Sequence, residues 1–452
     1  MSEQSQHWYF EPPTDWTVAR LADIAVIRFS NVDKKTVPGE VPVRLCNYMD
    51  VYANEYVTSR LSFMEASASS AEISRFTVDR GDVIATKDSE TPDDIGVPAV
   101  VVEDIPNLVC GYHLAHIKPN HNKVDSVFLG KQIANDRIAQ FFGRIANGST
   151  RYGLGSSGFE NLAIWLPPLP QQRKIARILT TVDNLIERTE ALIEKYKSIK
   201  QGMTHDLFTR GVNSNGQLRP PYENAPHLYK QSPLGWIPKE WEAVTLRTVY
   251  AEPSRNGLYK QAEFYGSGYP MIHMPQMFRS MIVDVGDAAL VRVDESEQRR
   301  FGLQSGDLLF ARRSLTLEGA GQCSLVPLLD EPATFESSII RVRLHQALVI
   351  PDLINQYLNT EKGYRQRLPF IRQVAVSGVS ADDVAAFPIP YPKCLKEQSM
   401  IMERITTLDS QMKQETAYLC KLRHHKSGLM QDLLTGKVRV NVDEAEEVTA
   451  DV

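Results

Sequence analysis

Residues 167–212 read PPLPQQRKIARILTTVDNLIERTEALIEKYKSIKQGMTHDLFTRGV. Apolar residues recur here in steps of three and four, with a gap at Thr189, which is the spacing of a heptad seam on one face of a long helix. The prolines that open the stretch cannot lie in a helix interior, and Gly211 is suited to end a helix. The pattern predicts a spacer helix within residues 166–212, and its predicted seam residues are Ile175, Ile178, Val182, Leu185, Leu192, Tyr196, Ile199 and Met203.

The same pattern returns near the end of the chain and predicts a second spacer helix within residues 389–440. Identical residues recur in the two stretches at a constant offset of 226 positions, as between Asp183 and Asp409, so the second helix is a copy of the first. Glu415 and Lys426 interrupt its apolar stripe. The predicted seam residues of this helix are Ile401, Ile405, Leu408, Met412, Leu419, Leu422, Leu429 and Leu433.

The duplication extends beyond the helices. Trp16 recurs as Trp241, and the pair Gly81-Asp82 recurs as Gly306-Asp307, both at an offset of 225. The chain is therefore two copies of one unit, a globular segment followed by a long helix, and two such units tend to arrange around a pseudo-twofold axis. We place the globular domains at residues 1–165 and, with the linker, at 213–388.

Both globular segments show the same order of elements. Short apolar runs bounded by turn residues, such as VPVRLC (41–46) and GDLLFARR (306–313), predict strands. Longer stretches at 127–146 and 352–368 predict one helix in each segment. Strands and helices do not alternate regularly, so each domain is expected to be α/β (α+β) with a largely antiparallel or mixed sheet. The linker around 213–235 is rich in Pro, Asn and Gly and is expected to be an extended connector.

The composition is that of an ordinary soluble protein, with 42% hydrophobic and 23% charged residues in a chain of 452. No apolar run is long enough to cross a bilayer, and the first residues lack the order of a signal peptide, so we expect a cytoplasmic protein without membrane contact. The five cysteines are odd in number and scattered, as expected for reduced thiols. Residues 441–452 are predicted to form an acidic, disordered tail.

A metal site deserves consideration at Cys110, His113 and His116, whose spacing could ligate an ion. If this segment is a strand, however, steps of three place alternate ligands on opposite faces. A structural role for these residues is therefore the preferred interpretation, and no metal ligand is predicted.

A net charge of −5 means that any DNA contact must come from local basic patches or from partner proteins. The polar loops that differ between the two copies are the candidates, because Arg and Lys bind guanine edges or phosphates and Asn and Gln bind adenine edges. For any single residue, a plain solvated position is the simpler interpretation. The DNA-binding candidates are Lys34, Lys35, Lys87, Ser89, Thr150, Arg151 and Tyr152 in the first copy and Arg255, Asn256, Lys260, Arg312, Arg313, Ser314, Arg372 and Gln373 in the second.

Signatures of catalysis are missing. The sequence has neither a phosphate-binding GxxxxGK[ST] loop nor a glycine-rich cofactor loop that opens a helix after a strand. The nearest match to an amino-methyltransferase motif begins with Arg219, which cannot accept the hydrogen of a target amino group. We therefore predict a non-catalytic protein without catalytic residues.

Two stretches carry a resemblance to a known family. LPPLPQQRKIA (166–176) leads into the first helix, and GLMQDLLTGKVRV (428–440) follows in the second. With the duplication, they make the chain resemble the specificity (DNA-recognition) subunit of type I restriction-modification systems over nearly its whole length. Two departures occur: Gln171 stands where the family usually has Glu, which Glu397 keeps, and the lead into the second helix is looser.

The resemblance implies that each globular segment is a target-recognition domain that reads one half of a bipartite, asymmetric site in double-stranded DNA. It also implies that the two spacer helices pack as an antiparallel coiled coil, separate the domains and dock two modification (methyltransferase) subunits, which restriction (translocase and nuclease) subunits join. No cofactor is then expected on this chain, and S-adenosylmethionine, ATP and Mg are expected on the partners. The alternatives are a duplicated coiled-coil adaptor without a nucleic-acid role and, disfavoured by the missing motifs, a stand-alone enzyme.

Overall fold

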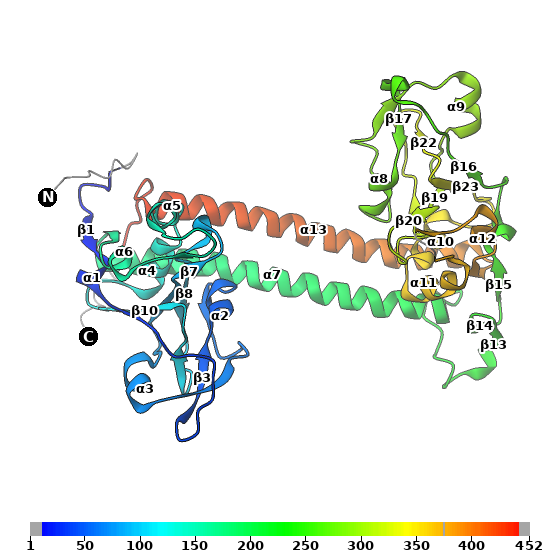
Figure 1. Ribbon diagram of the computed structural model, residues 1–452. Helices are drawn as coiled ribbons and strands as arrows, with labels where there is room; N and C mark the ends of the chain where they lie inside the picture. Colours follow the sequence, from blue (N-terminus) through cyan, green and yellow to red (C-terminus); the bar gives the residue numbers. More distant parts are fainter. Residues whose placement is uncertain (1–10, 374–375, 443–452) are drawn as a thin grey trace. The chain divides into compact units, whose positions relative to one another are not determined.

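A computed structural model describes residues 11–373 and 376–442, which form two compact units (Figure 1). Unit 1 comprises residues up to Ala191 together with those from Ala417 onward, and unit 2 comprises Leu192–Thr416. The two long helices, α7 (Leu169–Arg210) and α13 (Leu395–Leu434), each contribute to both units. The predicted acidic tail falls mostly on residues 443–452, which lie outside the described residues.

Unit 1 is built on a five-stranded sheet in the order β2-β10-β6-β8-β4, in which only β4 and β8 pair in parallel. A second sheet, β5-β3-β9, is also mixed. The elements are β1 (Thr17–Arg20), α1 (Leu21–Ile24), β2 (Ala25–Phe29), β3 (Val41–Cys46), α2 (Tyr48–Tyr52), β4 (Tyr56–Val57), β5 (Met64–Ala68), α3 (Ser70–Phe76), β6 (Val83–Thr86), β7 (Asp88–Ser89), η1 (Pro92–Asp94), β8 (Pro98–Val101), β9 (Leu108–Cys110), β10 (Leu114–Pro119), α4 (Ser126–Ile133), α5 (Asp136–Ile145), β11 (Tyr152–Gly153), α6 (Ser156–Glu160) and β12 (Ala163–Leu166).

Unit 2 repeats this plan with a four-stranded antiparallel sheet, β16-β23-β19-β21, and a mixed sheet, β18-β17-β22. The mixed sheets confirm the predicted α/β class. The elements are η2 (Pro226–Leu228), β13 (Tyr229–Ser232), β14 (Gly235–Pro238), β15 (Trp241–Thr245), η3 (Leu246–Val249), β16 (Arg255–Asn256), η4 (Ala262–Phe264), β17 (Tyr265–Ile272), α8 (Met274–Phe278), β18 (Ala289–Val291), α9 (Glu295–Phe301), β19 (Leu308–Ala311), β20 (Arg313–Ser314), β21 (Cys323–Leu325), β22 (Thr334–Phe335), β23 (Ile339–Val342), α10 (Pro351–Leu358), α11 (Glu361–Arg367), η5 (Leu368–Phe370), β24 (Ser377–Gly378), α12 (Ala381–Ala385) and β25 (Pro388–Pro392).

The repeated Gly-Asp pair closes the same turn in both units. Gly81 and Gly306 have φ of 92° and 88°, a region that glycine enters without steric cost. Asp82 then accepts the backbone N–H of Asp79 at 2.9 Å and lies 2.7 Å from the buried His116. Burial raises the pKa of Asp82, but the His116 hydrogen bond and charge, with Asp79 and Lys118, outweigh it and leave that pKa below its usual value.

The predicted helices at 127–146 and 352–368 are each two short helices, so this part of the prediction was wrong. Asn135 and Thr360 interrupt them, because each side chain accepts a backbone N–H, that of Arg137 at 2.9 Å and that of Gly363 at 3.0 Å. A side chain that caps a new helix also ends the preceding one. α4 and α5 in unit 1, and α10 and α11 in unit 2, are the result.

The linker is folded, in contrast to the extended connector that its composition predicts. β13 and β14 form a hairpin, and Arg219 is buried against Glu397 of α13 with 2.6 Å between Nη1 and Oε1. The same carboxylate accepts the indole N–H of Trp241 at 3.0 Å. Proline and glycine thus shape a packed segment here, because a buried ion pair and hairpin hydrogen bonds hold it.

The two long helices contact each other in both units, and their order in unit 1 is antiparallel. In unit 1, Asp183 of α7 contacts Lys426 of α13 at 2.7 Å, and Glu190 contacts Arg423 at 2.6 Å. In unit 2, Lys200 contacts Asp409 at 2.5 Å. Contacts move backward along α13 as they move forward along α7, which is the antiparallel order that the resemblance implies.

The predicted seam residues of the two helices differ in burial. Along α13, every predicted seam residue is buried or half-buried. Along α7, Leu185 and Ile199 lie on the exposed side with 38% and 43% of their surface accessible, while Leu179 and Ile193 are buried. The remaining predicted positions on α7, all buried or half-buried, are Ile175, Ile178, Val182, Leu192, Tyr196 and Met203.

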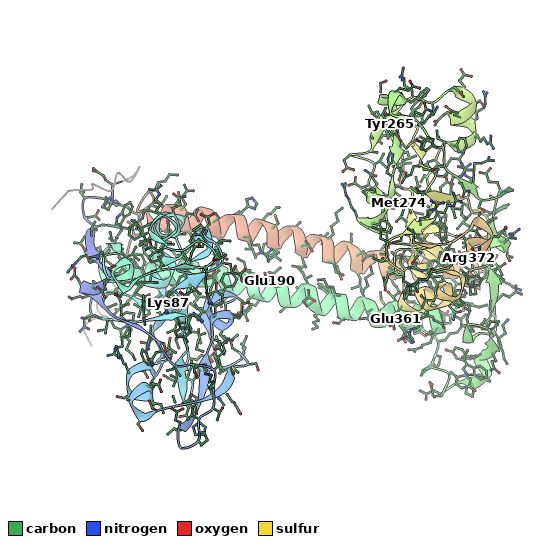
Figure 2. The ribbon with its side chains drawn as sticks, in the orientation of Figure 1. Lys87, Glu190, Tyr265, Met274, Glu361 and Arg372 are labelled. Carbon is green, nitrogen blue, oxygen red and sulfur yellow. The ribbon has the colours of Figure 1, made fainter. Side chains whose placement is uncertain are left out.

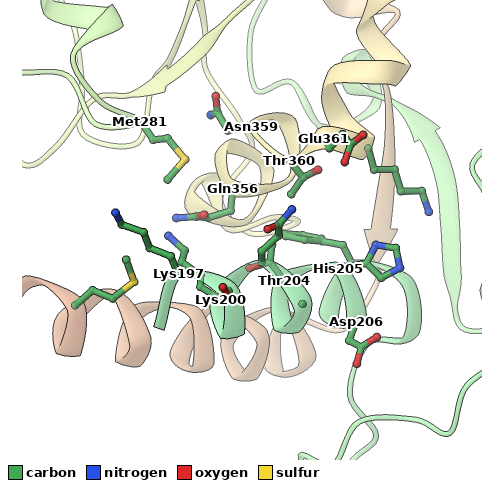
Figure 3. Close-up of a pocket in the computed structure, with 16 residues that line it drawn as sticks. Lys197, Lys200, Thr204, His205, Asp206, Met281, Gln356, Asn359, Thr360 and Glu361 are labelled. Carbon is green, nitrogen blue, oxygen red and sulfur yellow. The ribbon is translucent and has the colours of Figure 1, made fainter. Parts of the chain in front are cut away.

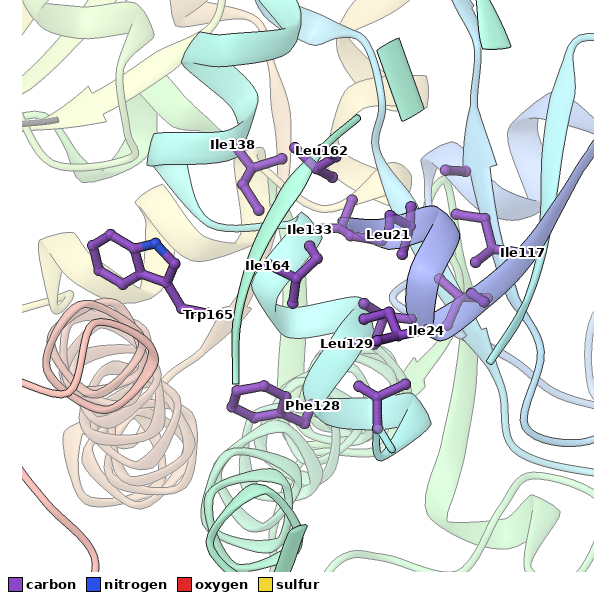
Figure 4. Packing of buried hydrophobic residues seen from close by; sticks show 14 of the residues in the cluster. Leu21, Ile24, Ile117, Phe128, Leu129, Ile133, Ile138, Leu162, Ile164 and Trp165 are labelled. Atoms are coloured by element: carbon purple, nitrogen blue, oxygen red, sulfur yellow. The ribbon is translucent and has the colours of Figure 1, made fainter. Parts of the chain in front are cut away.

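The ends of both helices enter the core of unit 1. Figure 4 shows its centre, where Phe128 and Leu129 of α4 pack with Ile164 and Trp165 of β12. Ile175 and Leu179 of α7 belong to this cluster, and so do two leucines at the end of α13, Leu433 and Leu434. The core of the first domain is therefore completed by residues from the end of the chain.

Candidate nucleic-acid interface

A short ribbon brings most of the predicted contact residues of unit 1 together. Ser89 of β7 stands opposite Tyr152 of β11 in an antiparallel pair. Lys87 directly precedes β7, and Thr150 and Arg151 directly precede β11. The pairing thus gathers polar side chains that are far apart in the sequence, and we name this surface the first ribbon.

His113, which the contact predictions do not include, lies at the centre of the first ribbon. Its φ of 74° is in the left-handed region, which costs about 1 kcal/mol for a residue with a side chain. Its Nδ1 is 2.6 Å from Asp88 Oδ2, and Arg151 Nη2 is 3.4 Å from its Nε2. The ring of Tyr112 packs on it at 4.0 Å between centroids, and Lys87 Nζ lies 5.0 Å from the Tyr112 centroid. The cluster combines a half-exposed aromatic ring, an imidazole and two cations, of which Lys87 lies 4.0 Å from Asp88 with 15% of its side chain exposed.

Three predicted residues of unit 1 do not expose their side chains on the first ribbon. Ser89 is only 7% exposed, and its hydroxyl accepts the N–H of Thr91 at 3.3 Å, so it shapes the turn. Lys34 and Lys35 are exposed in the segment between β2 and β3, outside the first ribbon, and Lys35 lies 3.7 Å from Asp33.

The equivalent ribbon of unit 2 is β20 with β24, where Arg313 stands opposite Gly378 and Ser314 opposite Ser377. These positions follow the first ribbon by the domain offset of 225, as Ser89 and Ser314 show. Arg372 joins the second ribbon through its backbone, which exchanges two hydrogen bonds of 3.0 Å with Gly378.

Arginine dominates the second ribbon. Arg312 immediately precedes β20 and is half-buried, while Arg313 is exposed. The side chain of Arg372 is 75% exposed, its nearest carboxylate is Asp383 at 3.5 Å, and the exposed Gln373 follows it. Figure 2 labels Lys87 and Arg372, one from each ribbon.

A loop that is held by hydrogen bonds follows β20 and exposes an apolar side chain. Leu315 is 90% exposed. The turn behind it is held by the Thr316 N–H, which donates to Ser314 Oγ at 3.1 Å, and by the buried Arg367, which donates to the carbonyl of Glu318 at 3.2 Å. A rigid loop of this kind limits the entropy lost on binding.

The three remaining candidates of unit 2 lie at or after β16, away from the second ribbon. Lys260 is committed to Glu297 at 2.6 Å, with 11% of its side chain exposed. Arg255 is half-buried and packs over the Phe301 ring at 6.0 Å, whereas Asn256 is exposed. Arg255 and Lys260 therefore have structural contacts of their own.

The contacts within each ribbon depend on the fold. The hydrophobic pattern of the sequence does not mark Asp88 or His113 as contact residues. Their side chains meet only because the loop before β10 turns back onto β7. The duplication is the signal that could have identified the ribbons, since it equates residues 88–89 with 313–314 and 152–153 with 377–378.

Neither a metal cluster nor a membrane span was found in the described parts of the chain. Among residues 11–373 and 376–442, His, Cys, Asp and Glu form no group of three or more that could hold a metal ion. His113 and His116 instead contact different carboxylates, those of Asp88 and Asp82. Across the same residues, every helix is too short or too polar to span a membrane.

The family model described as the type I restriction modification DNA specificity domain matches the chain twice, at residues 13–197 and 238–421. The putative type I restriction enzyme MjaX specificity subunit of Methanocaldococcus jannaschii is 23% identical over 441 residues, or 95% of each chain. The MjaVIII specificity subunit of the same organism is 27% identical over 292 residues, which cover 62% of this chain and 63% of that protein. The EcoKI specificity subunit of Escherichia coli is 24% identical over 67% of this chain and 59% of its own.

Solved structures share the fold. The crystal structure of a type I restriction-modification S subunit from M. genitalium superposes with a TM-score of 0.55 at 13% identity, covering 92% of this chain and 96% of that one. A chain from a study of complex assembly and conformational transition of the type I system superposes with a TM-score of 0.54 at 15% identity, covering 95% and 100%.

Proposed function

The chain belongs to the type I restriction-modification DNA specificity domain family, and from this membership we propose how its two target-recognition domains contact DNA. The first ribbon (β7–β11) and the second ribbon (β20–β24) face the duplex. Each reads one half of a bipartite, asymmetric site. The chain acts as the sequence-specificity subunit of its complex.

One observation supports this proposal. Both units have a short two-stranded ribbon at the equivalent place, and the two ribbons carry different side chains. The first ribbon carries Lys87, His113 and Arg151 on or beside its strands, and the second carries Arg313 and Arg372. Arginine pairs bidentately with guanine, whereas aromatic and imidazole groups contact bases in other ways. A shared scaffold with different side chains is what a protein needs to read two different half-sites.

The chain itself supplies recognition, and catalysis belongs to its partners. These are two modification subunits, which bring S-adenosylmethionine, and restriction subunits, which bring ATP and Mg. The net charge of −5 supports this division, because phosphate contacts for high affinity then come largely from the partners.

A map of adenine methylation tests the proposal. Single-molecule sequencing of cells with this gene and its neighbours is compared with that of cells lacking only this gene. One bipartite motif should disappear with the gene. Unchanged methylation in a strain with an active modification subunit would contradict the proposal and favour the adaptor alternative.

The double variant Arg313→Ala with Arg372→Ala tests the two ribbons separately, because it changes only the second ribbon. We expect recognition to relax in one half of the motif and to remain intact in the other, because each lost base contact costs roughly 1–3 kcal/mol of discrimination. Lys239→Ala, on an exposed turn outside both ribbons, is the control. Equal loss in both halves would contradict the assignment of one ribbon to one half-site.

A further inference from the structure

Unit 2 contains a cavity of about 910 Å³ between α7 and the helices α10 and α11 (Figure 3). Lys200 and Thr204 of α7 line one side, and Gln356 of α10 and Lys362 of α11 line another. Met281, from the segment before β18, closes a third side. The volume is that of a typical ligand pocket.

One polar group in this cavity is unsatisfied, and a partly buried lysine lines the cavity with it. Thr204 is 8% exposed, and within the described residues its Oγ1 has no hydrogen-bond partner. Burial lowers the pKa of Lys362, and no neighbouring charge or hydrogen bond opposes this effect. The acidic residues of the lining are already engaged, since Asp206 pairs with Arg210 at 2.8 Å and Glu361 pairs with Arg365. The cavity therefore favours an incoming acceptor or anion.

The duplication identifies the equivalent place in unit 1. The Val100 N–H donates to the carbonyl of Glu55 at 3.0 Å, and the Leu325 N–H donates in the same way to the carbonyl of Met281 at 2.9 Å. Met281 thus takes the place of Glu55. Likewise Gln356 takes the place of Lys131, because α4 and α10 begin at residues related by the domain offset of 225.

In unit 1, charged side chains of the chain itself occupy the equivalent place. Lys131 contacts Asp183 at 2.5 Å and also Glu55, and Lys426 contacts Asp183 at 2.7 Å and also Glu55. The Tyr56 hydroxyl donates to Asp183 at 2.6 Å and completes the network. Two carboxylates and two ammonium groups thus balance each other inside the unit.

Unit 2 keeps only the part of this network that belongs to the long helices. Lys200 and Asp409 are the copies of Lys426 and Asp183, and they contact each other at 2.5 Å. Met281 and Gln356 supply neither the second carboxylate nor the second ammonium group. The cavity lies where those two side chains would be.

We propose that this cavity is the docking pocket for a segment of a partner protein, which inserts a carboxylate side chain beside Lys200 and Lys362. Glu55 shows that a carboxylate fits at this place, because the chain itself uses a glutamate at the equivalent position of unit 1. The apolar side chains of Met281, Met412 and Phe208 accommodate the rest of the segment. The inference rests on the proposed function, in which modification subunits assemble on this chain.

The proposal implies that the two units dock their partners differently. Unit 1 is closed by its own residues at this position, whereas unit 2 is completed by the partner. A partner bound at unit 2 then gains a buried, charge-assisted contact that a partner at unit 1 does not make.

The test transplants the network of unit 1 into unit 2. Met281→Glu with Gln356→Lys, in the full-length chain, places a carboxylate and an ammonium group where Glu55 and Lys131 stand. We expect the variant to fold with an unchanged or higher Tm and to bind its second modification subunit at least tenfold more weakly. Native mass spectrometry and titration measure the stoichiometry and the affinity.

Single variants show whether weaker binding results only from misfolding. Lys362→Glu should weaken the same binding step by repelling the carboxylate, while Lys239→Glu, on the exposed turn between β14 and β15 that does not line the cavity, should not. A folded double variant that binds both modification subunits with unchanged affinity overturns the proposal.

Two further outcomes are distinguishable. If sodium glutamate raises the Tm of the wild-type chain but not of the double variant, while partner affinity is the same for both, the pocket binds a free carboxylate and the protein partner is wrong. If the wild-type chain binds no modification subunit and its deletion leaves methylation unchanged, the proposed function fails together with the inference. A motif that depends on the gene, combined with unaffected docking, overturns the inference alone.

Discussion

Glu397 shows how one side chain explains a difference between the two copies. Its carboxylate accepts hydrogen bonds from Arg219, Trp241 and the Val212 N–H at 2.6, 3.0 and 3.1 Å. Gln171 has the equivalent place in the first copy, where the indole nitrogen of Trp16 has no hydrogen-bond partner within the described residues. The buried Arg219 requires a carboxylate as its counterion, and Glu397 supplies it. A neutral amide such as that of Gln171 would leave a buried arginine without a counterion.

Glu397→Gln should therefore destabilise unit 2 by roughly 3 kcal/mol, because it leaves the Arg219 guanidinium buried without its counterion. Hydrogen exchange measured by mass spectrometry should show the loss of protection in the linker and around Trp241. Glu240→Gln removes a more exposed partner of the same arginine, at 3.5 Å, and should cost less than about 1 kcal/mol. Equal effects of the two variants would show that the buried pair is not decisive.

Asp183 predicts a dependence of stability on pH. Burial raises the pKa of this carboxyl group, but the charge and hydrogen bond of Lys131, with the hydrogen bonds of Lys426 and Tyr56, outweigh burial and leave the pKa below its usual value. A carboxyl group whose folded-state pKa is depressed stabilises the protein fully above its unfolded pKa of about 4 and loses that contribution as the pH falls through the lower, folded value. Unfolding free energy should decline below about pH 4.

Urea unfolding between pH 7 and pH 3 measures this effect. Asp183→Asn should lose roughly 3 kcal/mol at pH 7 and show a shallower decline in acid, because the titrating group is gone. Asp409→Asn, at the copied position of unit 2 where the side chain is 36% exposed rather than 8%, should lose less. An unchanged acid slope in the Asp183 variant would contradict the assignment.

The long helices show how the heptad pattern can mislead by one position. The apolar residues of α7 allow two neighbouring stripes, one through Leu185 and Ile199 and one through Leu179 and Ile193. The structure buries the second. Subtracting the offset of 226 from the seam of α13 leads to the buried stripe, since Ile405 and Leu419 map to Leu179 and Ile193.

Alanine substitutions distinguish the two stripes. Leu179→Ala should cost about 3 kcal/mol, because it empties a fully buried site, whereas Leu185→Ala should cost less than about 1 kcal/mol. Thermal unfolding of both variants beside the wild type measures the difference. Similar losses would mean that α7 is packed on both faces.

The candidate interface could be predicted only in part. Exposed polar residues in the variable loops, such as Arg151 and Arg313, were identifiable, because the two copies diverge there. The burial of Ser89 and the pairing of Lys260 with Glu297 were not, since they depend on which segments the fold brings alongside. His113 was missed for the same reason.

Unit 1 is discontinuous along the chain. Its core contains Leu433 and Leu434 of α13, and Gln132 of α4 donates to the carbonyl of Leu434 at 2.8 Å. Unit 2, by contrast, is one continuous segment. The fold of the first domain therefore depends on the last helix.

Ending the chain after Lys426 should test this dependence. Residues 11–191 should lose hydrogen-exchange protection, because two buried leucines leave their core, each of which contributes roughly 3 kcal/mol. Residues 192–416 should retain theirs. Leu434→Ala alone should shift the same region more mildly, and a uniform loss across both units would contradict the division.

The sequence alone was enough for the duplication, the two long helices, the mixed α/β class and the family, because these follow from repeated residues and from hydrophobic periodicity, which are local or self-similar. Three features required the tertiary structure: the contact of His113 with Asp88, the folded linker around Arg219, and the contrast between the charge network of Glu55 and Lys131 and the cavity at Met281 and Gln356. Each depends on which side chains meet across long separations. Helical periodicity restricts a residue to a face, but burial and charge pairing are settled only when another element packs against that face.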